Sequence, residues 1–143
     1  MLRCKRLFAV LAVLICWGTA LSFQTEQTAE QAAQKVAGSW LPLLDSQKYE
    51  ESWEALSPKT KERYSKRQWG VGMMGFRQPL GKLKSRTFGK VVYTKSLQGY
   101  PEHEGAIVRF DSAYENKESV IELVGVIHDK DGKWRVLLYT IPE

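Results

Sequence analysis

Glu122 has the most unusual surroundings of any acidic residue, because it lies inside the apolar run SVIELVGVIH at positions 119–128. A carboxylate on an apolar face must be paired, or its pKa rises because burial disfavours the charge. Glu122 could therefore serve as a general base in a pocket, form a structural ion pair with an arginine, or face water at a sheet edge. We favour the last two interpretations, the ion pair or the exposed edge position, over the general base, since structural ion pairs also perturb pKa values. The candidate partners are Arg77, Arg86, Arg109 and Arg135.

Positive charge is concentrated in one stretch of the chain, residues 59–95. This stretch has eleven Lys or Arg and a single acid, for a net charge of +10, whereas residues 21–58 and 96–143 each carry −4. A concentrated positive field attracts anions such as lipid head groups or lipopolysaccharide phosphates. The alternative, which we favour, is that the acidic flanks fold back and neutralise it. The candidates for anion binding are Lys82, Lys84, Arg86 and Lys90.

Other motifs that could support chemistry are incomplete. The pattern G-x-G-x-x-G at 70–75 follows a helical stretch and has no acid about twenty residues on, so a dinucleotide site is not expected. His103 and His128 lack metal-ligand spacing, and the run DKDG at 129–132 lacks the other ligands of a calcium loop. We therefore expect no cofactor and no metal.

The first twenty residues have the three-part layout of a secretory signal peptide. A basic start at 1–6 precedes an uncharged apolar run from Leu7 to Trp17, and small residues follow up to Ala20. We expect cleavage after Ala20. Cleavage after Ser22 and retention as a membrane anchor are the alternatives, and a lipid-modified Cys16 fits less well because a lipobox needs a small residue before the cysteine.

Cleavage would change the composition of the mature protein. The net charge of the chain, +5, would fall to +2, and both cysteines would be lost because they stand at positions 4 and 16. Disulfides, thiol chemistry and cysteine-based metal sites are then excluded. An exported protein, periplasmic or secreted, is also separated from nucleic acid, so we expect no nucleic-acid partner.

The first half of the mature chain has helical periodicity. Residues 21–28 form a loose leader, and a single domain is expected over 29–143. Thr28 and Gln31 can form a capping box for a helix that Pro42 should kink or end. The run 45–47 should form a turn that caps a second helix. Two further helix starts are Ser57-Pro58 and Ser65 with Gln68, the latter opening a helix with Trp69, Met73 and Phe76 on one face.

The second half alternates with a period of two, which is typical of strands. Four strands are predicted, at 86–96, 105–114, 119–128 and 133–141, with a hairpin turn at 129–132. Helices followed by such strands predict an α+β fold, with N-terminal helices packed on one face of a curved, cone-like antiparallel sheet of three or four strands. Four tryptophans, Trp40, Trp53, Trp69 and Trp134, are expected in its core.

Several of these residues also define a family resemblance, which covers about residues 32–141. The shared features are Trp40-Leu41 with Asp45, Tyr49 and Ser52-Trp53, then Trp69, Arg77-Gln78-Pro79-Leu80-Gly81, Ser85-Arg86, Glu122 and the run 131–136. They resemble the small exported bacterial proteins grouped as domain of unknown function 4019, although the glycines at 70, 72 and 75 depart from that pattern. The order of elements is similar to the nuclear-transport-factor-two-like cone. The resemblance implies export and assigns no catalytic residue.

The sequence thus predicts an exported, non-enzymatic binding or interaction domain for an unknown small ligand or protein. Two alternatives stay open. One is a small pocket enzyme that uses Glu122 as its general base, and the other is a binder of anionic lipid or lipopolysaccharide surfaces through residues 59–95.

Overall fold

The computed structural model describes residues 27–142. The predicted signal peptide lies outside the described residues. The elements run α1 (Ala29–Asp45), α2 (Tyr49–Glu54), α3 (Pro58–Lys61), α4 (Lys66–Arg77), a 3-10 turn (Gln78–Leu80), β1 (Leu83–Thr94), β2 (Gly105–Tyr114), β3 (Lys117–His128) and β4 (Trp134–Thr140). No helix within the described residues is long and apolar enough to cross a membrane.

Local sequence signals account for where the helices begin. The helix starts predicted at Thr28 and Ser65 are both confirmed, and each forms a capping box. The Thr28 or Ser65 side chain accepts a hydrogen bond from the backbone N–H three residues on, and the glutamine side chain at that position accepts one from the backbone N–H of the capping residue. Ser57 caps α3, and Pro58 occupies its first turn, as predicted.

Two expectations about the region after Pro42 were not met. Of the two outcomes expected at Pro42, a kink or an end, the end is contradicted, because the helix continues to Asp45 with Pro42 inside it. The run 45–47 does not cap α2, because Asp45 is the last residue of α1 and the N-cap of α2 is Lys48, which makes no side-chain capping bond. Asp45 is instead held by distant arginines, and that contact could not be read from local sequence.

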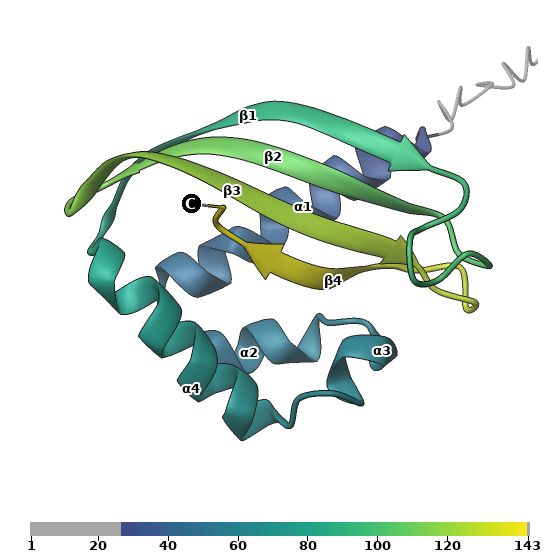
Figure 1. The fold of residues 1–143 in the computed structure, drawn as a ribbon, viewed down its shortest axis with the longest axis horizontal. Helices are drawn as coiled ribbons and strands as arrows, with labels where there is room; N and C mark the ends of the chain where they lie inside the picture. Colours follow the sequence, from purple (N-terminus) through teal and green to yellow (C-terminus); the bar gives the residue numbers. More distant parts are fainter. Residues whose placement is uncertain (1–26, 143) are drawn as a thin grey trace, which may run out of the picture.

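The four strands form one antiparallel sheet in the order β1-β2-β3-β4, so both β1 and β4 are edge strands. The predicted α+β fold is confirmed. Gly132 has a φ of 78° in the β3–β4 turn, a conformation that glycine adopts without steric cost. Figure 1 shows α1 crossing one face of the curved sheet, while α2, α3 and α4 lie beyond β4.

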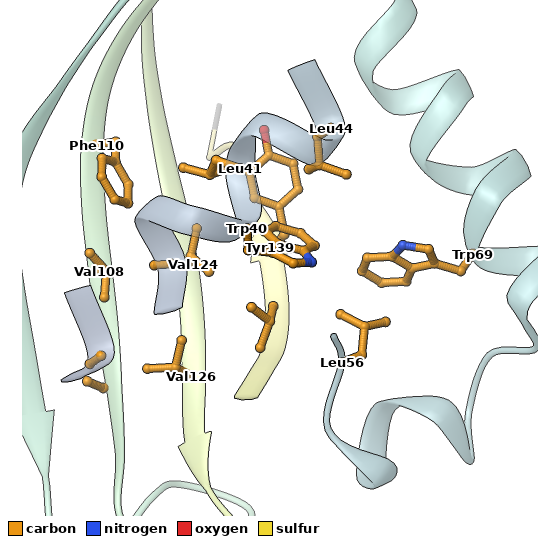
Figure 2. Packing of buried hydrophobic residues seen from close by; sticks show 14 residues of the cluster. Trp40, Leu41, Leu44, Leu56, Trp69, Val108, Phe110, Val124, Val126 and Tyr139 are labelled. Carbon is orange, nitrogen blue, oxygen red and sulfur yellow. The ribbon is translucent and has the colours of Figure 1, made fainter. Parts of the chain in front are cut away.

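The core lies between α1 and the inner face of the sheet. Alternate residues of β2 and β3 are buried on this face, which is the pattern expected for a half-buried sheet. Figure 2 shows Trp69 reaching from α4 towards Trp40 and Tyr139. The ring centroids of Trp40 and Tyr139 are 5.6 Å apart, and those of Trp40 and Trp69 are 6.2 Å apart. Of the four predicted core tryptophans, Trp40 and Trp69 are buried, whereas Trp53 and Trp134 are half-buried.

The glycine-rich pattern at 70–75 lies wholly within α4. A helix cannot cradle a pyrophosphate with its middle turns, because their N–H groups are already bonded within the helix. An added Cβ would meet nothing within 4 Å at Gly72 or Gly75. Gly72 and Gly75 therefore leave open space beside the helix.

Candidate functional site

Two features of the structure concern function: a buried network of charged groups around Glu122, and a large open groove beside α4. The network joins α1, α4 and all four strands through six side chains. These are Asp45, Arg77, Arg86, Tyr114, Glu122 and Tyr139.

Glu122 is fully buried, and its carboxylate is surrounded by donors. Arg86 donates Nε to Oε2 at 3.1 Å and Nη2 to Oε1 at 3.0 Å, and the Tyr114 hydroxyl also donates to Oε1. A guanidinium nitrogen of Arg77 lies 3.6 Å from the same oxygen. The carboxylate thus forms the structural Glu–Arg pair that the sequence left open as one interpretation. Glu122 is not among the lining residues of the three best-formed cavities found in residues 27–142.

Asp45 is the second carboxylate of the network and sits at its partly exposed edge. Arg86 donates both Nη atoms to it, at 2.6 and 2.9 Å, and Arg77 donates a third bond. Arg77 also donates to the Tyr139 hydroxyl at 2.7 Å. Two arginines therefore balance two carboxylates, so the buried group carries no net charge.

The tyrosines of the network are held neutral by their surroundings. Burial and the hydrogen bond to Glu122 both raise the pKa of Tyr114. Burial, together with the nearby charge of Glu122, raises the pKa of Tyr139 to about 12. For Arg86, burial by itself would lower the pKa, but the bonds to Asp45 and Glu122 outweigh burial and raise it.

These raised tyrosine pKa values predict a loss of stability at alkaline pH. The unfolded chain ionises its tyrosines near pH 10, whereas the folded protein keeps Tyr114 and Tyr139 protonated. Their contribution is therefore complete below about pH 10 and is lost as the pH rises towards about 12. Urea unfolding at a series of alkaline pH values measures this decline. Tyr139→Phe should flatten it, and Tyr64→Phe, which removes an exposed hydroxyl, should leave it unchanged; equal slopes for both variants would contradict the account.

The four predicted anion-binding residues do not share one environment. Arg86 is half-buried and turned into the network, whereas Lys82, Lys84 and Lys90 are exposed on or just before β1. Lys90 pairs in register with Arg109 on β2, so two positive side chains are neighbours there. The Arg86 guanidinium already donates hydrogen bonds to Asp45 and Glu122, so it is not available to an external anion in this arrangement.

The acidic flanks neutralise part of the basic stretch, as we favoured. Five of its eleven basic residues pair with acids from outside residues 59–95. These are Lys59, Lys61, Lys66, Arg77 and Arg86. Within the described residues, the other six make no ion pair.

The two histidines make other contacts in the structure. His103 is buried and bonds through Nδ1 to the backbone carbonyl of His128 at 2.9 Å. The ring of His128 stacks on Trp134. No group of three or more potential metal ligands occurs in the part of the chain that the structure describes.

The larger feature is a groove of about 960 Å³ between α4 and β4, which we call the α4–β4 groove. Helix α4 forms one wall and β4 forms the other. The α3–α4 connection and the β1–β2 loop also contribute lining residues. Its apolar lining includes Tyr64, Trp69, Met73, Phe76, Leu97 and Leu138. Its volume is typical of a small-molecule site.

Three large apolar side chains of this lining are unusually exposed. Tyr64 is 48%, Phe76 39% and Leu138 40% exposed. Contiguous exposed apolar surface on a folded domain commonly marks a place of binding. The sequence placed Trp69, Met73 and Phe76 on one helix and expected Trp69 in the core; Trp69 is buried, whereas Met73 is half-buried and Phe76 is exposed.

Leu138 was not singled out from the sequence. It lies over Gly125 of β3, where an added Cβ would be 2.6 Å from the Leu138 Cγ. The register shift between Gly125 and Val126 places two leucines, Leu137 and Leu138, side by side along the groove wall. The Leu-Leu pair at 137–138, which breaks the alternation of β4, was the available signal.

A curved four-stranded antiparallel sheet wrapped around a long helix defines an NTF2-like α+β cone. A crystal structure from Campylobacter jejuni, provisionally described as an NTF2-like transpeptidase, is similar, with a TM-score of 0.51 and 17% sequence identity. The match covers 73% of this chain and 96% of that chain, and at this identity it shows the fold alone.

The chain belongs to the family DUF4019, a family of proteins of unknown function, which matches residues 36–139. Both resemblances seen in the sequence are thereby confirmed. A comparison with curated proteins gave no match.

Proposed function

We propose that this protein is an exported, non-enzymatic binding domain whose ligand site is the α4–β4 groove. The observation that carries the proposal is the groove itself, about 960 Å³ of space with Tyr64, Phe76 and Leu138 exposed along its walls. Exposed apolar surface costs free energy in water, and an apolar ligand would remove it from water.

The buried network argues for a binding role rather than catalysis. A general base must be within hydrogen-bond reach of a substrate proton. Glu122 is fully buried, accepts bonds from Arg86 and Tyr114, and does not line the three best-formed cavities of the described residues. The network therefore supports the fold, and an enzyme that uses Glu122 is not proposed. The transpeptidase description of the Campylobacter jejuni protein is not transferred, since 17% identity carries no activity.

Titration with Nile red, a neutral apolar dye, tests the proposed site. The purified protein should bind the dye saturably with a one-to-one stoichiometry, because the groove offers one continuous apolar surface. Absence of saturable binding would contradict the proposal.

Export rests on the layout of residues 1–20, with a basic start, an apolar run and small residues before the expected cleavage after Ala20. Expression of the full chain in bacteria, followed by cell fractionation and N-terminal sequencing, tests it. The mature protein should be recovered outside the cytoplasm and begin near Leu21. Recovery of uncleaved protein from the cytoplasm would overturn this part of the proposal.

A further inference from the structure

We propose that the ligand of the α4–β4 groove is a single-chain amphiphile with a carboxylate head, bound with its head beside Arg63. This inference rests on the proposed function and adds to it the chemical class and the orientation of the ligand. Three observations support it: the charge of the groove lining, the position of that charge, and the length of the apolar wall.

The groove lining carries charge of one sign. Arg63 is the charged residue among its lining side chains, and no acid lines it. An apolar ligand with a negative end would match this distribution, whereas a positive end would be repelled. A charge-assisted hydrogen bond to a guanidinium is stronger than a neutral one.

Arg63 lies in the segment that joins α3 to α4, before the first residue of α4. Its guanidinium carbon is 5.7 Å from the centre of the Tyr100 ring, and the Lys59 ammonium is 4.8 Å from the same centre. Lys59 also pairs with Glu102 at 3.9 Å, so these three charged groups sum to +1. Arg63 is exposed and makes no ion pair within the described residues. A ligand head placed here would stay in contact with water while its chain lay in the groove.

The apolar wall leads away from this charge along α4. Trp69, Met73 and Phe76 line it in order from the end nearer Arg63. From Lys66 to Phe76 the helix rises by about 15 Å, which suits an extended alkyl chain. An apolar wall with a cation at one end fixes the direction of such a chain.

Competition against Nile red by decanoate, kept below its micellar concentration, and decanol, kept below its aqueous solubility, tests the inference on the purified protein. The two ligands share a chain and differ in the charge of the head. Decanoate should displace the dye at a concentration about tenfold lower than decanol, and added salt should reduce that advantage. Equal potency of the two ligands would overturn the inference and leave the proposed function standing.

Variants at Arg63, with one at Arg67 as a control, test where the head group of the ligand binds. Arg63→Gln should abolish the preference for decanoate, and Arg63→Lys should retain a preference because it keeps the charge. Arg67→Gln removes an exposed charge that does not line the groove and should leave the preference intact. An equal loss in Arg63→Gln and Arg67→Gln would overturn the inference. Failure of the dye itself to bind would contradict the proposed function instead.

Discussion

Glu122→Gln is expected to lower the free energy of unfolding by about 3–5 kcal/mol. The substitution keeps the size of the side chain and removes one negative charge. Arg77 and Arg86 would then share a single carboxylate, that of Asp45, and the buried network would carry an uncompensated positive charge. Urea denaturation of the purified variant measures the loss.

Two further variants separate charge balance from general damage. Glu118→Gln changes an exposed carboxylate on the same strand and should alter stability by no more than about 0.5 kcal/mol. Glu122→Leu combined with Arg86→Leu removes one charge of each sign and should recover much of the loss, because buried pairs can be replaced by apolar groups at little cost. A Glu122→Gln protein as stable as Glu118→Gln would contradict the structural role of the network.

Gly72→Phe is expected to weaken apolar ligand binding by about tenfold or more while leaving the protein at least as stable. An added Cβ at Gly72 meets nothing within 4 Å, and Gly72 lines the α4–β4 groove. A phenyl ring there would occupy the groove itself. A ligand would have to displace the ring, and the loss of the ring's burial would cost about 1.5–3 kcal/mol of binding free energy. Glycine is also unfavourable inside a helix, so its replacement should stabilise α4 by a few tenths of a kcal/mol.

Gly75→Phe provides the matched control for this substitution. Gly75 lies in the same helix with equally open surroundings, and it lines none of the described cavities. It should give the same gain in helix stability without affecting binding. Thermal unfolding of the two variants confirms that both are folded before binding is compared.

Most of the fold could be predicted because its signals are local. Capping residues such as Thr28 and Ser65 act within one helical turn. The alternation of apolar and polar residues in β2 and β3 shows which residues form the inner face of the sheet. The same alternation placed Glu122 on one face with Val120, Val124 and Val126, but it left open whether that carboxylate is buried or faces water; the structure buries it. What failed was the end of α1, where Asp45 is stabilised by arginines more than thirty residues away.

The groove could not be predicted, because it depends on how α4 is placed relative to β4. Helical spacing identifies Trp69, Met73 and Phe76 as one face, yet the same spacing describes a core face and a binding wall equally well. The choice between Glu–Arg pairing and general-base chemistry could not be made from the sequence either, because it depends on which of four arginines reaches Glu122 in the tertiary structure. The folded sheet decides between the two, because its register brings the Arg86 guanidinium against the Glu122 carboxylate.

Parallel Nile red titrations of the wild-type protein, Gly72→Phe and Gly75→Phe test most directly whether the α4–β4 groove is the ligand site. The account predicts saturable binding by the wild type and Gly75→Phe with equal affinity, and binding at least about tenfold weaker for Gly72→Phe. Equal affinity for all three proteins, with Gly72→Phe shown to be folded, would place the ligand elsewhere and contradict the account.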